Sequence, residues 1–207
     1  MSAWAQRERA VLVELFRTLG PDADVLCEGW TTADLAAHLY VRERRPDAAP
    51  GAVLPGPAAS YTARVMASVL RVNGFDNVVD ILAAGPPRLL RPLDEQMNLV
   101  EFFIHVEDVR RAHGDQPRSL PPEMERALFA RLRVLLRMSL LRLRDVEVEV
   151  VTEHGERASY GHGPRVELRG PVGDVALWVF GRKAAAAVDL SGDPESILRL
   201  ERLRLSV

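Results

Sequence analysis

Hydrophobic positions recur at helical spacing through the first 145 residues of the chain. Gly20 and Pro21 end the first such stripe, and four prolines and two glycines between residues 46 and 59 predict a loop. The stripes predict helices over residues 2–19, 31–45, 58–73, 76–84, 93–113 and 121–144. This part of the chain is therefore predicted to be an all-helical bundle.

The second predicted helix has a well-marked beginning. Thr31 is a favourable N-cap residue, and Asp34 stands three residues later in a capping-box-like arrangement. Trp30 and Leu35 stand where a hydrophobic staple would form across this N-terminus. The helix is therefore expected to start at Thr31 and to end before Pro46.

After residue 145 the pattern changes from helical spacing to alternation. Residues 146–151 alternate between valine and glutamate, and residues 153–156 read as a tight turn. Further strands are predicted at 158–161, 165–170 and 186–192, and helices at 172–182 and from 193 onwards. The fold class is thus mainly α: a bundle over 1–145, followed by a small α+β domain over 146–207. About 60 residues are near the lower limit for independent folding, so this domain is expected to pack on the bundle.

The helix predicted over 93–113 carries charged residues in an unusual place. With Glu101 at 0°, His105 falls at about 40° and Asp108 at about 340° on a helical wheel, in one narrow stripe. Glu107, Arg110 and Arg111 form a separate stripe, and apolar residues lie between the two. A surface helix normally has one polar face, which is expected here to be the second stripe. The first stripe therefore needs another explanation.

Metal binding would explain this stripe. A carboxylate and an imidazole four residues apart on a helix can converge on one ion, and helix bundles build such sites from inward-pointing glutamate and histidine. His38, between Leu35 and Leu39 in the second helix, is the candidate third ligand. Asp108 could hydrogen-bond a ligand imidazole or act as a further ligand. Both His38 and the Glu101–His105 pair could equally be metal-free hydrogen-bonding groups, so spacing alone leaves the choice open.

Composition narrows the class of partner. A net charge of −2 gives no electrostatic reason to expect nucleic acid or an anionic membrane, and no apolar run is long enough to span a bilayer. The N-terminus lacks a signal-peptide pattern, so the expected location is cytoplasmic. The single cysteine, Cys27, excludes an internal disulfide framework and lies outside the proposed ligand motif.

The segments WTTADLAAHL and EFFIHVEDVRRAHG resemble the DinB-like, mycothiol-dependent maleylpyruvate isomerase superfamily, and are most similar to its uncharacterised actinobacterial metal-binding subgroup. The resemblance implies an up-down four-helix bundle in which His38, Glu101 and His105 bind a zinc-type ion, with Asp108 completing the motif. GDVALWVFGR and VDLSGD resemble the sterol-carrier-like C-terminal domain of that family. Gly181-Arg182 matches its glycine-arginine pair, which implies that Arg182 binds a carboxylate or the thiol cofactor.

The resemblance implies a metal- and mycothiol-dependent transferase or isomerase that acts on a small electrophilic substrate. The chain differs from the isomerase in length and in its proline-rich loop, so the same substrate is not expected. One alternative is a non-catalytic module that binds metal or a small ligand, and another is a structural protein whose polar stripe is internal hydrogen bonding. A homodimer is a possible assembly.

Overall fold

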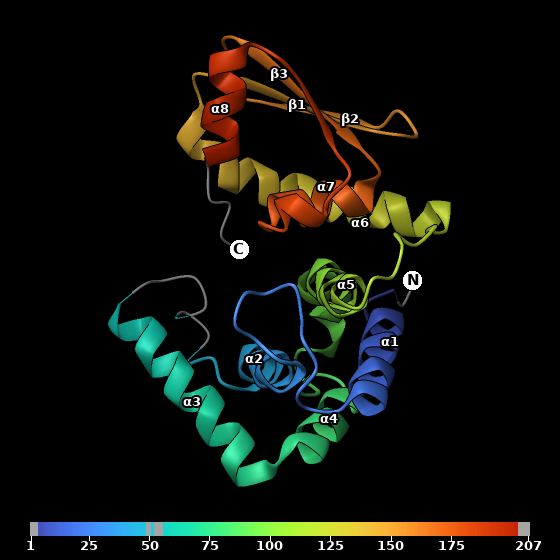
Figure 1. The fold of residues 1–207 in the computed structure, drawn as a ribbon, viewed down its shortest axis with the longest axis vertical. Helices are drawn as coiled ribbons and strands as arrows, with labels where there is room; N and C mark the ends of the chain where they lie inside the picture. The colour runs from blue at the N-terminus through green and yellow to red at the C-terminus, as the bar shows by residue number, and fades with distance from the viewer. Residues whose placement is uncertain (1–3, 49–50, 52–55, 203–207) are drawn as a thin grey trace. The chain divides into compact units, whose positions relative to one another are not determined.

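The computed structural model describes residues 4–48, 51 and 56–202 (Figure 1). Ser2, where the first helix is predicted to begin, and residues 49–50 and 52–55 of the loop predicted over 46–59 lie outside the described residues. The chain is mainly helical and contains one four-stranded sheet, as the sequence predicts. It divides into two compact units, Met1–Gln116 and Pro117–Val207.

The first unit consists of helices whose apolar stripes meet in one core. Its elements are α1 (Trp4–Leu19), α2 (Thr32–Arg44), α3 (Pro57–Asn73), α4 (Phe75–Ala83), the short 3₁₀ helix η2 (Arg91–Leu93) and α5 (Asp94–Ala112). Each helix lies within a few residues of its predicted range, so the helical spacing of the sequence is confirmed here. Helix α1 packs against α5 and α4, and α2 packs against α3 and α4.

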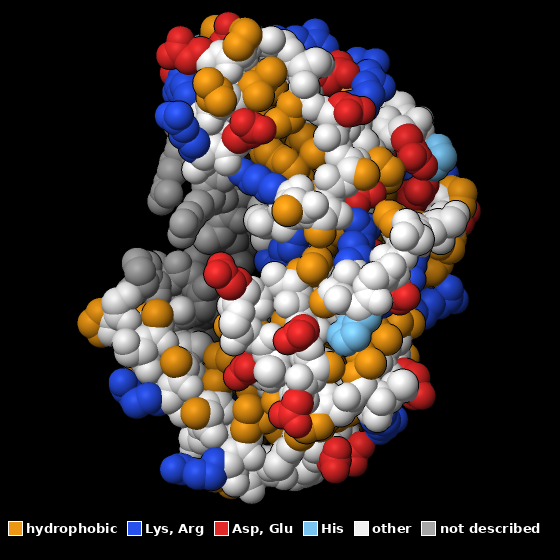
Figure 2. Space-filling view, viewed as in Figure 1, with side chains coloured by type: hydrophobic (Ala, Val, Ile, Leu, Met, Phe, Trp, Pro, Cys, Tyr) orange, Lys and Arg blue, Asp and Glu red, His pale blue; other side chains and the backbone are white. Residues whose placement is uncertain are grey.

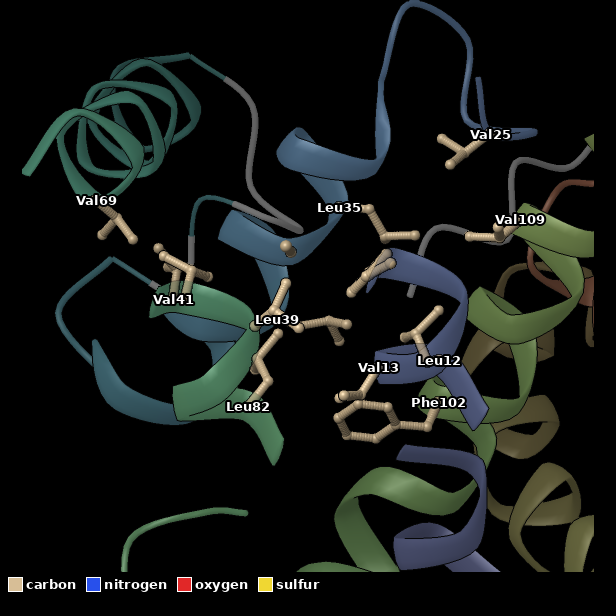
Figure 3. Packing of buried hydrophobic residues seen from close by; sticks show 14 of the residues in the cluster. Leu12, Val13, Val25, Leu35, Leu39, Val41, Val69, Leu82, Phe102 and Val109 are labelled. Atoms are coloured by element: carbon tan, nitrogen blue, oxygen red, sulfur yellow. The ribbon is translucent and has the colours of Figure 1, made fainter. Parts of the chain in front are cut away.

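The core of the first unit joins side chains from distant parts of the sequence. Leu12 of α1, Leu39 of α2, Leu82 of α4 and Phe102 of α5 are all buried and lie in one cluster (Figure 3). Removing this apolar surface from water is the main term that holds the four helices together. The packing also determines which faces of α2 and α5 turn towards one another.

The beginning of α2 has the predicted cap. The backbone N–H of Thr31 donates to the Asp34 carboxylate at 3.0 Å, and Trp30 packs against the core cluster that contains Leu35. This arrangement gives partners to backbone groups that the first turn would otherwise leave without them.

A buried ionic cluster connects three helices of this unit. One guanidinium nitrogen of Arg9 lies 2.7 Å from Glu43 and 2.8 Å from Asp94. Asn98 donates to both carboxylates, and the Arg9 guanidinium lies 4.2 Å from the centre of the Phe102 ring. Because all three charged side chains are buried, each depends on its partners for solvation.

The second unit contains the sheet. Its elements are α6 (Pro122–Ser139), the 3₁₀ helix η3 (Leu140–Leu143), β1 (Glu147–Thr152), β2 (Arg157–Tyr160), β3 (Arg165–Gly170), α7 (Val172–Val179), the 3₁₀ helix η4 (Lys183–Ala185), β4 (Asp189–Gly192) and α8 (Pro194–Arg202). All of the predicted strands are present. The strand order is β2-β1-β3-β4, with β1 parallel to β3 and the other pairs antiparallel.

The register of the sheet explains the valine-glutamate alternation. Val148 pairs with Val166 and Val150 with Leu168, and all four side chains are buried. Glu149 is also buried, and Arg157 and Arg165 of the neighbouring strands form ion pairs with it. Helix α7 packs on β3, while α6 packs on α7 and β2 (Figure 1).

The chain divides into its two units at a different residue from the predicted boundary. The sequence places the boundary near residue 145, at the change in periodicity, whereas the division by contacts falls between Gln116 and Pro117. The difference is α6, which is helical like the first unit but packs on α7 and β2 of the second. The boundary at 145, between a helical bundle and a small α+β domain, stays a prediction.

Charged side chains are interspersed over the visible surface. On the face in Figure 2, acidic and basic side chains are both scattered among apolar and uncharged ones. Within the described part of the chain, no helix has both the length and the apolar character needed to cross a membrane.

Candidate metal centre

Three of the predicted ligands come together between α2 and α5. His38 Nε2 lies 3.1 Å from Glu101 Oε1, and His105 Nε2 lies 3.3 Å from the same oxygen. One ligand atom from each residue lies within 4.8 Å of the other two. The helical spacing aligns Glu101 with His105 on α5, and the packing of the helices brings His38 to them from α2.

The surroundings hold these side chains in place. The exposed fractions of the His38, Glu101 and His105 side chains are 15%, 12% and 7%. The His38 ring lies 5.4 Å from the Trp30 ring and 5.4 Å from the His105 ring. The cluster is therefore largely shielded from solvent, with His38 its most exposed imidazole.

Burial and hydrogen bonding shift the pKa values of the three groups in different directions. Burial lowers the pKa of His38. Burial opposes ionisation of Glu101, but hydrogen bonds from His105 and His38, with the charge of Arg42, outweigh it and hold the Glu101 pKa well below its usual value. Burial also disfavours the charged form of His105, yet hydrogen bonds to Asp108 and Glu101 outweigh it and raise the His105 pKa.

Asp108 contacts the ring nitrogen of His105 that faces away from Glu101. The distance from His105 Nδ1 to Asp108 Oδ2 is 2.9 Å, and Asp108 is fully buried. A carboxylate in this position accepts the Nδ1–H of His105. Once Nε2 has lost its proton, its lone pair would then be directed towards Glu101 and His38. Of the two predicted roles for Asp108, this distance favours the orienting one.

Cys27 lies beside the site, although sequence spacing places it far from the ligand motif. Its Sγ lies 3.4 Å from Asp108 Oδ2, and Cys27, His105 and Asp108 form a second group of converging ligand atoms. Cys27 is not part of the group formed by His38, Glu101 and His105, but the fold places it against Asp108. The backbone of the segment before α2 runs beside α5. There the N–H of Leu26 donates to the carbonyl oxygen of Asp108 at 3.1 Å.

Arg42 is a second residue that the sequence analysis missed. Its Nε lies 3.2 Å from Glu101 Oε1, and its Nη2 donates to the carbonyl of Met97 at 2.7 Å. The signal in the sequence is its position four residues after His38, on the same face of α2. Its positive charge favours the ionised form of Glu101.

The second polar stripe of α5 is not the water-facing surface that the sequence predicts. Glu107 is fully buried, and the Arg111 side chain is only 8% exposed. Glu107 accepts from Arg110 at 3.1 Å and from Arg111 at 2.7 Å. Local ion pairing thus makes burial of this stripe tolerable.

Arg182 belongs to the second unit, where it follows α7 directly after Gly181. Its guanidinium donates to the carbonyl of Phe180 at 2.6 Å. A third group of converging ligand atoms, Glu125, Glu153 and His154, also lies in this unit. Glu153 and His154 are exposed, and His154 Nε2 lies 2.9 Å from the buried carboxylate of Glu125.

The donor set of the α2–α5 cluster fits a divalent ion of the zinc type. Two imidazole nitrogens and one carboxylate oxygen are the ligands of open zinc sites, in which a fourth position is left to water or a ligand. The neutral form expected for His38, the ionised form of Glu101 and the orientation of His105 by Asp108 are those that such an ion needs.

Comparison with solved structures finds a related fold. The chain is similar to a protein described as the mycothiol-dependent maleylpyruvate isomerase, with a TM-score of 0.55 and 17% sequence identity over 91% of this chain and 90% of the other. At this identity the likeness shows a shared fold and a distant structural relationship. No protein-family model and no curated protein matches the chain.

Proposed function

We propose that His38, Glu101 and His105 bind one divalent ion, most favourably zinc, and leave at least one coordination position for an external ligand. The observation that carries this proposal is the convergence of three ligand atoms from two helices within 4.8 Å. A bound ion of this kind would supply a Lewis acid and lower the pKa of a thiol or water that coordinates it.

The chain's own residues have separable roles in this proposal. His38 and His105 supply nitrogen ligands, and Glu101 supplies the charge that favours a cation. Asp108 holds the His105 ring, while Arg42 and the burial around Glu101 keep that carboxylate oriented. Trp30 packs against the His38 ring and limits the access of water.

We further propose a thiol-dependent transferase or isomerase that uses mycothiol or another low-molecular-weight thiol and acts on a small electrophile. The supporting observations are the fold shared with the isomerase and the open donor set. The finer description of the fold, a DinB-like four-helix bundle with a sterol-carrier-like C-terminal domain, belongs to the same proposal. Arg182 is proposed as a residue that binds an anionic group of the thiol or the substrate.

Metal content of the purified protein tests the first step. Elemental analysis of the full chain should find about one zinc-type ion per chain, and His105→Ala should abolish it. His113→Ala is a matched control, because His113 ends α5 and its Nδ1 lies 2.8 Å from the Val109 carbonyl, outside the cluster. Equal metal content in wild type and His105→Ala would overturn the assignment and favour the metal-free structural alternative.

Thiol affinity separates the enzyme from the non-catalytic binding module. Mycothiol should bind the metal-loaded chain and should not bind the metal-free chain, and Arg182→Ala should weaken binding without changing metal content. Stoichiometric metal without affinity for any low-molecular-weight thiol would overturn the thiol-dependent function and support the binding module.

A further inference from the structure

A groove lies within the second unit, and the proposed metal chemistry uses none of its residues. It has a volume of about 790 Å³ and lies between α6 and β2. Its lining includes residues of both elements, from Ala130 on α6 to Tyr160 on β2. This volume lies in the range of small-molecule binding sites in proteins.

The charged residues that line this groove are all basic. Arg133, Arg137 and Arg144 contribute guanidinium groups, and His162 contributes an imidazole; no acidic residue is among the lining residues. The neighbouring carboxylate of Asp145 accepts two hydrogen bonds from Arg199, at 2.8 and 2.9 Å. In a chain with a net charge of −2, this concentration of positive charge favours an anion.

Arg133 and Arg137 are placed to act on the same ligand. They stand four residues apart on α6, so their side chains leave the same face of the helix, and both are exposed. Guanidinium groups present several donors in one plane and match the geometry of carboxylate and phosphate oxygens.

Apolar surface accompanies the positive charge. Val134 lies between the two arginines in sequence and is 60% exposed, and Ala130, Leu140 and Ala158 add further apolar lining. The hydroxyl of Tyr160 donates to the carbonyl of Arg133 at 3.1 Å, which joins β2 to α6 at one side of the groove. A ligand that fits these walls therefore has a hydrocarbon part beside its anionic group.

We propose that this groove binds a small amphiphilic anion, with the arginines holding a carboxylate or phosphate group and Val134 contacting a short hydrocarbon chain. The site is distinct in residues and chemistry from the His38, Glu101 and His105 cluster. Anion binding in the groove would not depend on metal binding by that cluster.

Titration calorimetry with the full-length chain tests the proposal with three probes: octanoate, octyl phosphate and neutral octanol. Both anions should bind saturably, and octanol should bind roughly tenfold more weakly or worse, because it lacks the charge that the arginines recognise. The anion that binds more tightly identifies the preferred head group. The affinity should fall as the salt concentration rises.

The double variant Arg133→Ala, Arg137→Ala should weaken the binding of both anions by roughly tenfold or more. Arg126→Ala is the matched control, because Arg126 is an exposed arginine of α6 that pairs with Glu123 and does not line the groove. Val134→Ser should weaken the two octyl probes and leave the weak binding of inorganic phosphate unchanged. Absence of saturable binding, equal binding of octanol, or unchanged affinity in the double variant would each overturn the proposal.

Discussion

His105 uses its two ring nitrogens for different purposes. Nε2 lies 3.3 Å from Glu101 Oε1, where the proposed ion would bind, and Nδ1 lies 2.9 Å from the buried carboxylate of Asp108. The orientation of one nitrogen thus depends on the partner of the other. Cys27 extends this chain of contacts by one residue, through Asp108 Oδ2.

Asp108→Asn should lower metal affinity by about 10- to 100-fold while leaving the helix content unchanged, because an amide is a weaker acceptor for the Nδ1–H of His105. The measurement is competition with a chromophoric chelator. Asp22→Asn, which changes an exposed aspartate in the turn before α2, is the control and should have no effect. If both variants bind metal as wild type does, Asp108 does not orient the ligand.

Metal affinity should also rise with pH through the neutral range. Asp108 and Glu101 raise the pKa of His105 despite its burial, so the metal-free chain keeps a proton on this ring to higher pH than an ordinary histidine. An incoming ion must displace that proton, and the competition disappears once the pH exceeds the raised pKa. Glu101 stays ionised over this range because its pKa is lowered.

Dissociation constants for zinc at a series of pH values between about 6 and 8 measure this effect. The curve should level off at high pH, where the imidazole is already neutral. An affinity that does not change with pH would contradict the protonation state assigned to His105.

At the scale of the elements, ion pairs of very different burial join the helices. The Arg9 and Glu43 side chains are 4% and 2% exposed, whereas those of Arg17 and Asp80, also paired at 2.7 Å, are 51% and 66% exposed. The two pairs have the same N–O distance, so any difference in their contribution to stability is expected to come from their exposure to solvent. Water and ions screen the exposed pair, while removal of one buried partner leaves other charges without solvation.

Arg9→Met should therefore lower the free energy of unfolding by about 3–5 kcal/mol, because Glu43 and Asp94 would remain as uncompensated buried carboxylates. Arg17→Met should change it by no more than about 1 kcal/mol. Urea denaturation of both variants, followed by circular dichroism, gives the comparison. Similar losses in the two variants would show that burial does not control the strength of these pairs.

At the scale of the whole molecule, α6 is the element that separates the boundary predicted near residue 145 from the observed division after Gln116. Its apolar stripe includes Leu128, Leu132 and Leu136, which are almost completely buried, and the helix packs on α7 and β2. A fragment that ends at residue 145 keeps α6 but loses both partners. Its apolar face would then be exposed to solvent.

We therefore expect a fragment of residues 1–145 to aggregate more than a fragment of residues 1–116, which ends where the first unit ends. Size-exclusion chromatography at equal concentrations measures this. The shorter fragment contains Cys27 and every proposed metal ligand, so its metal content is a second readout. A monomeric 1–145 fragment beside an aggregated 1–116 fragment would support the boundary predicted from the change in periodicity.

Local sequence was sufficient to predict the elements and part of the candidate site. The apolar spacing of each helix, the Thr31–Asp34 cap and the valine alternation of β1 depend on neighbouring residues, so they can be read without knowing the fold. The alignment of Glu101 with His105 has the same origin, since both lie on one helical face. His38 is predicted as a ligand by its position on the core side of α2 and by the family resemblance.

Tertiary structure alone decided the contacts between residues that are distant in sequence. Cys27 reaches Asp108 across 81 residues, and Arg9 reaches Asp94 across 85. The assignment of α6 to the second unit and the burial of Glu107 also depend on contacts that the local sequence does not contain. Periodicity determines which face of a helix is apolar or charged, but only the packing of all the helices determines what that face meets.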